Sequence, residues 1–247
     1  MGTCELSGSN NDRWITEVIY PDKTDGFYVE LGAGDWMKES ASYPLEQLGW
    51  RGVSVEMNPY FAGQFAENRR NPCVHAAIWK SNGNIEAIFP QKNVFRAGVS
   101  CIRSRHQQKW DAKQKVLKDW VPTVTWEKLF SSNYRFLKPT ITSMWNYDST
   151  IKLYEMDTSV PNHIDAIIID IEGAEKTVMP LFPFNVCTVG AWIIETSAPR
   201  WLHDLMSFYG YMEVENPLNT GGKHNRYFLN EANYNDRGRA VREAMVP

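Results

Sequence analysis

The chain has 247 residues, 43% of them hydrophobic and 13% aromatic, which is enough apolar material for the core of one globular domain. A formal net charge of −3 excludes a general attraction of the whole chain to nucleic acid or to an anionic membrane. No apolar run reaches the roughly 18–20 residues of a membrane span, and residues 1–14 lack the apolar centre of a signal peptide, so we expect a cytoplasmic protein.

The first recognisable unit is a strand, a glycine turn, a helix and a second strand. The apolar run GFYVEL at 26–31 predicts the first strand, and GVSVE at 52–56 predicts the second. Helical spacing over residues 40–50 predicts a helix with Pro44 in its first turn. This order within about 30 residues is typical of one right-handed βαβ unit.

Further elements follow from the same signals. Apolar, β-branched runs such as IDAIIID are typical of parallel strands covered on both faces. Asn and Gly residues between the last two strands favour a reversing loop, and hence an antiparallel hairpin. The predicted elements are a helix at 59–70, strands at 73–79, 164–170 and 190–195, and hairpin strands at 209–215 and 225–230.

Strands that alternate with helices and close with a hairpin predict a doubly wound α/β fold. Its sheet is mostly parallel and seven-stranded, with an antiparallel C-terminal hairpin, in a single domain over residues 1–247. Residues 95–163 are polar and less periodic, and we expect an inserted lid or substrate-recognition segment there. We also expect a strand at 83–89, just before this insertion. Within it we expect an edge strand that runs into a helix at 123–130.

Acidic residues end four of the predicted strands: Glu30, Glu56, Asp170 and Glu195. Doubly wound sheets bind their ligands at this carboxyl edge, so the coincidence is the main functional clue. At the end of the second strand, Glu56 can accept hydrogen bonds from ribose hydroxyls. A solvated turn residue is the alternative, and the glycine turn one βαβ unit earlier favours the ligand.

Gly32 and Gly34 follow the first strand, where they permit a tight turn and let a ligand approach main-chain N–H groups. The third glycine of the dinucleotide fingerprint is missing, because Met37 occupies its position, and this disfavours a pyrophosphate. An acid at the turn suits a cationic group. S-adenosylmethionine carries an ammonium and a sulfonium, and no phosphate.

Three blocks resemble the FkbM-type S-adenosylmethionine-dependent methyltransferases: residues 26–59, IDAIIIDIEGAEKTVM and WIIETS. The chain departs from the family where Trp36 follows Gly34 and Asp35, and where Ala41 follows Ser40. Trp36 either covers the methionine end of the cofactor or packs against its neighbours. The resemblance implies a Rossmann-like class I methyltransferase fold, with HAAIW near the adenine. It implies cofactor contacts at Glu30, Gly32, Ala33, Gly34, Asp35, Ser40, Glu56, Met57, Ala77 and Asp170.

Methylation of a hydroxyl needs a group that takes its proton, or a cation that lowers its pKa. Asp170, Glu172 and Glu195 are the catalytic candidates because they leave neighbouring strands toward the methyl group. Asp170 and Glu195 are also candidate ligands for a divalent metal such as Mg²⁺, while the alternative for Asp170 is to cap the next helix. His106, in the predicted lid, is the candidate for a histidine base.

We therefore expect an O-methyltransferase that acts on a hydroxyl of a sugar, glycan or related small molecule. Residues 96–118 carry seven Lys or Arg against one Asp, which indicates a solvated helix face or an anionic acceptor such as a nucleotide-linked sugar. A nucleic-acid ribose methyltransferase is disfavoured, because Glu195 stands where its catalytic set has Lys. The sequence is also compatible with a nicotinamide-dependent sugar oxidoreductase or with a binding module without activity, and no membrane partner is expected.

Overall fold

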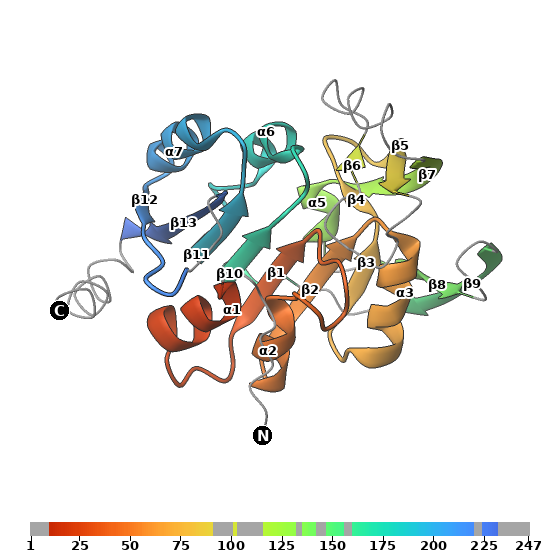
Figure 1. Cartoon of the computed structure of the whole chain (residues 1–247), viewed down its shortest axis with the longest axis horizontal. Coiled ribbons are helices and arrows are strands. Elements are labelled where there is room, and N and C mark those ends of the chain that lie inside the picture. The colour runs from red at the N-terminus through yellow and green to blue at the C-terminus, as the bar shows by residue number, and fades with distance from the viewer. Residues whose placement is uncertain are drawn as a thin grey trace.

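A computed structural model describes residues 10–90, 101–102, 116–131, 135–141, 147–155, 160–219 and 224–231 (Figure 1). The helical segments are α1 (Asn11–Arg13), the π-helical η1 (Trp14–Ile19), α2 (Ser42–Gln47), α3 (Pro59–Asn68), α5 (Trp126–Leu129), α6 (Glu175–Val178), η3 (Met179–Leu181) and α7 (Pro199–Phe208). The strands of the main sheet are β1 (Phe27–Leu31), β2 (Arg51–Glu56), β3 (Cys73–His75), β10 (His163–Ile169), β11 (Thr188–Glu195), β12 (Tyr211–Val214) and β13 (Asn225–Asn230).

The main sheet has seven strands in the order β12-β13-β11-β10-β1-β2-β3. Five neighbouring strands, β3, β2, β1, β10 and β11, run parallel to one another. β13 lies between β11 and β12 and runs antiparallel to both. The chain leaves β1 toward β2 and β3, and later returns to the other side of β1 as β10 (Figure 1). The fold class predicted from the sequence is confirmed. This order is consistent with the Rossmann-like class I methyltransferase fold, whose ligand crevice lies at the reversal between β1 and β10.

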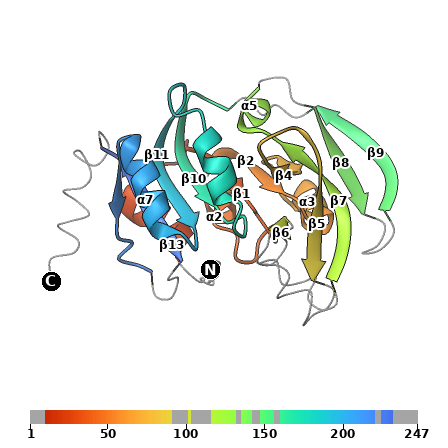
Figure 2. The same cartoon turned by 90° about the horizontal axis from the view of Figure 1, so that it is seen from above.

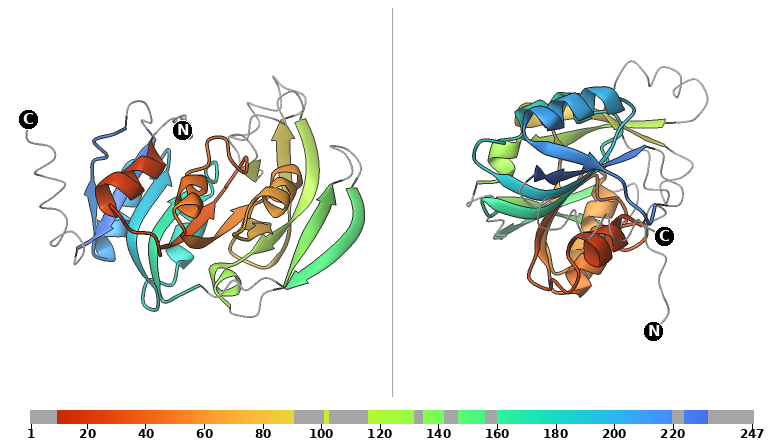
Figure 3. Two further views of the ribbon diagram at one scale, coloured as in Figure 1. Left: turned by 90° about the horizontal axis from the view of Figure 1, so that it is seen from below. Right: turned by 90° about the vertical axis from the view of Figure 1, so that its left-hand side faces the viewer.

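Helices cover both faces of the main sheet because the strand residues alternate between two apolar cores. Val29 and Leu31 of β1 belong to the core that α6 and α7 cover, whereas Tyr28 belongs to the core that η1 and α2 cover. Figure 2 shows α6 and α7 on one side of the sheet, and Figure 3 shows α1, α2 and α3 on the other. Burial of each large apolar side chain in these cores stabilises the folded state by about 1.5–3 kcal/mol relative to leaving it exposed.

Two helices begin and end close to the positions that the sequence predicts. Pro44 lies in the first turn of α2, and Pro59 is the first residue of α3. The Asn58 side chain caps α3 by accepting the Tyr60 N–H at 3.0 Å. The hairpin of β12 and β13 is also confirmed. Helix α7 and the segment α1–η1 were not predicted.

The single strand predicted at 73–79 is wrong, because the chain divides it between two sheets. β3 pairs with β2 in the main sheet, and β4 (Ala77–Ile78) pairs with β7 (Val116–Val124) in a second sheet. Between them the Ala76 N–H donates to the carbonyls of Glu56 and Val74, at 3.1 and 2.9 Å. The segment is apolar apart from His75, and its side-chain pattern does not mark the break.

The second sheet has the order β4-β7-β5-β6, with β5 at Gly83–Pro90 and β6 at Cys101–Ile102. β5 confirms the strand predicted at 83–89, and β7 with α5 confirms a strand followed by a helix at 123–130. The expected edge position of that strand is wrong, because β7 pairs with β4 on one side and with β5 on the other. β8 (Arg135–Ile141) and β9 (Tyr147–Glu155) form a separate antiparallel pair.

Part of the segment predicted as an insertion is anchored in the main core. Trp126 and Leu129 of α5 belong to the larger core, and Trp126 Nε1 donates to the Val178 carbonyl at 2.9 Å. His106 and most of the basic residues of 96–118 lie outside the described residues, so the base and the lid stay predictions. Over the part of the chain that the structure describes, no helix combines the length and the apolar character needed to cross a membrane.

Candidate functional site

The loop after β1 touches the loop after β10 so closely that only glycine fits between them. Gly32 has a φ of +75°, and its N–H donates to the Val55 carbonyl at 2.9 Å. The Asp170 N–H in turn donates to the Leu31 carbonyl at 3.0 Å. A Cβ added to Gly32 would lie 1.7 Å from the Asp170 carbonyl oxygen. The glycine of the turn is therefore required by this contact as well as by its left-handed backbone.

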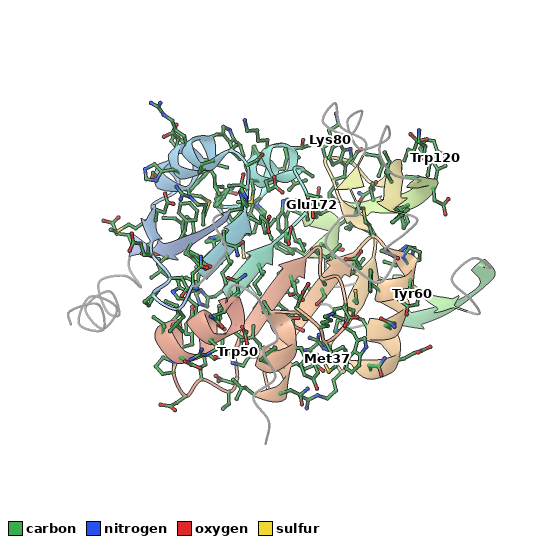
Figure 4. The ribbon with its side chains drawn as sticks, viewed as in Figure 1. Met37, Trp50, Tyr60, Lys80, Trp120 and Glu172 are labelled. Atoms are coloured by element: carbon green, nitrogen blue, oxygen red, sulfur yellow. The ribbon has the colours of Figure 1, made fainter. Side chains whose placement is uncertain are left out.

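The first cavity opens beside this contact, at the carboxyl ends of β1, β2 and β10. Its volume, counted out to the open solvent at its mouth, is about 780 Å³. Figure 4 shows Glu172 in the loop between β10 and α6, above this edge of the sheet. The lining residues are Gly32, Ala33, Gly34, Asp35, Lys38, Glu39, Val55, Glu56, Met57, Ala76, Ala77, Ile78, Asp170, Ile171, Glu172 and Ala174.

Glu56 joins the glycine turn to the end of β2. One carboxylate oxygen accepts the Gly34 N–H at 2.8 Å, and the other accepts the Asn58 N–H at 2.6 Å. The residue is 5% exposed, and burial raises the pKa of its carboxyl to about 7, although both N–H groups favour the charged form. The Met57 N–H also favours the charged form. An ionised carboxylate has about four acceptor positions, so Glu56 can accept a further donor from a ligand.

The loop from Gly34 to Glu39 is built around Asp35, which accepts the N–H groups of Met37 and Lys38 at 2.9 and 2.8 Å. This turn places Lys38 and Glu39 on the cavity wall. Glu39 has a φ of +62°, a left-handed conformation that is uncommon outside glycine and that occurs at functional sites. The sequence contains no signal for either lining residue.

Four carboxyl groups gather on the β10–β11 side of the site: Asp170, Glu172, Glu175 and Glu195. The surrounding protein and repulsion from Glu195, Glu172 and Glu175 together raise the pKa of Asp170 to about 8. A hydrogen bond between Asp170 and Glu195 acts in the same direction. The surrounding protein and repulsion from Glu195 and Glu175 raise the pKa of Glu172 to about 7.

The backbone of the β10–α6 loop holds this cluster in a strained turn. Glu172 has a φ of +52° and Gly173 a φ of +96°. Glu175 is buried and accepts the Gly173 N–H at 2.9 Å, so it stabilises the turn before α6. The N-cap of α6 is Ala174, and no side chain caps this helix, so Asp170 does not have the capping role that the sequence left open. Asp170 is instead exposed on the cavity wall.

Glu30 lies beneath α2 and does not line the first cavity. It is 4% exposed, and its carboxylate accepts the hydroxyl of Ser42 and, at 3.3 Å, the Ser42 N–H. Burial raises the pKa of Glu30, while Ser42 and the nearby Arg69 favour its charged form. Ser40 is also buried under the helix, 3.3 Å from the Ser42 hydroxyl. Neither side chain lines the first cavity.

Arg69 holds this region together from the end of α3. Its guanidinium is fully buried, and it donates to Glu46 at 2.8 Å, to the Tyr28 hydroxyl at 3.1 Å and to the Trp36 carbonyl at 2.8 Å. The Trp36 ring meets Tyr43 edge to face, with centroids 5.8 Å apart. Of the two roles considered for Trp36, the structure places it in packing, away from the lining of the first cavity.

A second cavity of about 810 Å³ adjoins the first on the side of β11. The two share the Gly32–Ala33 turn, Glu39 and Asp170, so Asp170 stands on their common wall. The lining residues are Asn11, Glu30, Leu31, Gly32, Ala33, Glu39, Ala41, Ile168, Ile169, Asp170, Ile193, Glu195 and Asn225. Asn11, Asn225 and Glu39 had no signal in the sequence.

The predicted site residues thus fall into four groups: those that line the first cavity, those that line only the second, one that lines neither and one outside the described residues. Glu30 and Glu195 line the second cavity, Ser40 lines neither, and His106 is outside the described residues. Among the described residues, no group of three or more His, Cys, Asp or Glu is arranged to hold a metal ion. Asp170 and Glu195 would supply two of the six ligands of Mg²⁺, so a metal stays a prediction. The first cavity is lined by Gly32, Ala33, Gly34, Asp35, Glu56, Met57, Ala77, Asp170 and Glu172.

No protein-family model matches the chain, and neither a curated protein nor a solved structure matches it. What supports a function is thus the edge of the main sheet itself. There the glycine turn, the Glu56 carboxylate and the Asp170–Glu195 pair lie beside two adjoining cavities.

Proposed function

We propose that the protein binds S-adenosylmethionine in the first cavity and transfers its methyl group to a hydroxyl oxygen of a sugar, glycan or related small molecule. The hydrogen bond from Gly34 to Glu56 is the observation that carries this proposal. It places the glycine turn and the carboxylate at the end of β2 on one cavity wall, as a nucleoside cofactor requires. The resemblance to the FkbM-type methyltransferases supports the same cofactor.

The lining of the first cavity suits the three parts of this cofactor. Val55, Ala77 and Ile78 provide an apolar wall for an adenine ring, and Glu56 can accept ribose hydroxyls. Asp170 and Glu172 suit the ammonium and the sulfonium. Acidic side chains thus outnumber the cations in this lining, where Lys38 is the one Lys or Arg, and this disfavours the pyrophosphate of a nicotinamide dinucleotide.

Within this proposal the cofactor supplies an electrophilic methyl group, and the protein supplies position and a proton acceptor. Asp170 and Glu195 stand at the ends of the adjacent strands β10 and β11, and a hydrogen bond joins their side chains. A carboxylate whose pKa is raised toward 8 is a stronger base than an ordinary one, so the pair can take the proton of an attacking hydroxyl. The tight contact of Gly32 with Asp170 fixes this pair relative to the first cavity.

Isothermal titration with S-adenosylhomocysteine tests the cofactor assignment. We expect micromolar binding to the wild-type protein, and at least tenfold weaker binding to Glu56→Ala, a loss of about 1.4 kcal/mol or more. Glu67→Ala is the matched control, because Glu67 is an exposed glutamate of α3 outside the cavity lining. Thermal unfolding of each variant checks that its fold is kept.

NADH provides the opposing arm of the same titration. Binding of NADH without binding of S-adenosylhomocysteine would favour the sugar oxidoreductase instead. Binding of neither compound, with and without EDTA, would refute the proposed cofactor. Equal affinities of wild type and Glu56→Ala would refute the role given to Glu56.

A further inference from the structure

The second cavity has its own set of polar side chains, drawn from three elements. Glu195 is the last residue of β11 and pairs in register with Asn225 of β13. Residues opposite each other in an antiparallel pair point to the same face, and two residues along, Ile193 and Tyr227 face the core under η1. Glu195 and Asn225 therefore share the face that α1 and η1 cover.

Asn11 of α1 completes this polar group from above the sheet. Its amide oxygen accepts the Tyr227 hydroxyl at 2.8 Å, which holds the side chain against β13. Asn10 fixes the start of α1 by donating to the Leu218 carbonyl at 2.7 Å. Asn11, Asn225 and Glu195 thus line one cavity whose far wall is Asp170, on the boundary with the first cavity.

The ionisable side chains that line the second cavity are acidic. Four carboxyl groups line the cavity, those of Glu30, Glu39, Asp170 and Glu195, together with two side-chain amides. Among the described residues the lining contains no Lys, Arg or His. A phosphate there would meet carboxylates without a neutralising cation, which is unfavourable. Hydroxyl or ammonium groups, in contrast, can donate to the carboxylates and exchange hydrogen bonds with the amides.

We propose that the second cavity is the acceptor site, and that it binds a hydroxyl compound without anionic groups, such as an uncharged or amino sugar. This inference rests on the proposed methyl transfer and narrows its substrate class. Asn11 and Asn225 bind the acceptor, and its reacting hydroxyl lies at Asp170, where the two cavities meet. The phosphorylated or nucleotide-linked sugars considered from the basic stretch 96–118 do not fit this lining.

Ligand-observed NMR on the S-adenosylhomocysteine complex tests this acceptor site with three sugars that differ in charge. Methyl glucoside and glucosamine are expected to show saturation transfer, and glucose 6-phosphate is expected to show none. Asn225→Ala should reduce the signals at least fivefold, while the affinity for S-adenosylhomocysteine changes less than twofold. Asn84→Ala, an exposed residue of β5 outside both cavities, is the control and should change neither.

A gain-of-function variant tests the charge argument separately. Asn225→Lys places a cation in the lining, so saturation transfer to glucose 6-phosphate should appear. The acceptor site is overturned if glucose 6-phosphate binds the wild-type complex as well as the other sugars do, if none of the three binds, or if Asn225→Ala has no effect. Failure of S-adenosylhomocysteine itself to bind would instead refute the proposed function, and the acceptor site with it.

Discussion

Substitution of Gly32 by alanine should both destabilise the protein and abolish cofactor binding. The new Cβ would lie 1.7 Å from the Asp170 carbonyl oxygen, and such atoms do not approach within 3.0 Å, so the two loops must separate by more than about 1 Å. Overpacking of this kind costs about 1–3 kcal/mol, and a left-handed alanine about 1–2 kcal/mol. The Asp170–Leu31 hydrogen bond contributes about 1 kcal/mol more, so we expect a total of about 3–6 kcal/mol.

Gly210→Ala isolates the part of this cost that comes from the contact. Gly210 has a φ of +79°, close to the +75° of Gly32, but a Cβ there would meet nothing within 4 Å. We therefore expect Gly210→Ala to cost about 1–2 kcal/mol and to leave binding of S-adenosylhomocysteine unchanged. Urea unfolding with equal m-values measures both variants. Equal losses of stability in the two variants would refute the argument that the loops are in contact.

Two further predictions concern buried charge. The pKa of Glu56 is raised from about 4.5 to about 7 in the folded protein, so its contribution to stability is complete below about pH 4 and is lost as the pH rises through 7. Urea unfolding at pH 5 and pH 8 should show a decrease in stability that Glu56→Gln makes smaller by up to about 3 kcal/mol, because the raised pKa values of Asp170 and Glu172 remain in that variant. An unchanged decrease in Glu56→Gln would contradict the contribution of Glu56. Arg69→Met removes the buried cation beside Glu46, leaves only the longer ion pair to the exposed Arg70 at 3.6 Å, and should cost about 3–5 kcal/mol. Arg70→Met, whose side chain is 70% exposed, should cost less than about 1 kcal/mol in thermal unfolding. Similar melting temperatures for these two variants would refute the role of Arg69.

The sheet could be predicted from the sequence because its local signals agree. Runs such as IDAIIID can only be buried strands, and the prolines at 44 and 59 fall in first turns, where proline is tolerated. The break at Ala76 could not be predicted, since it depends on β7, about 40 residues later in the chain. Local apolar patterns contain no information about which of two sheets a strand will join.

The predicted site was less complete because it depends on loops and on distant partners. Glu195 is visible as the acid at a strand end, but Asn11 reaches the same cavity from the start of the chain and Asn225 from near its end. Both are brought there by the antiparallel position of β13 and by the Tyr227–Asn11 hydrogen bond. Neither contact leaves a trace in the spacing of residues along the chain.

Glu30 and Glu56 show how strand register separates two residues with the same local pattern. Each stands at the carboxyl end of an apolar strand, and both were predicted to contact the cofactor. In the sheet, Glu30 pairs with Ser54, so Glu56 lies two residues, or about 7 Å, further toward the carboxyl edge on the same face. Around Glu30 this face of the sheet is covered by α2, and the nearby Arg69 favours the charged form of the carboxyl. Around Glu56 the same face opens into the first cavity. Because register is set by pairing and not by local sequence, Glu30 lies beneath α2 on the wall of the second cavity and Glu56 on the wall of the first.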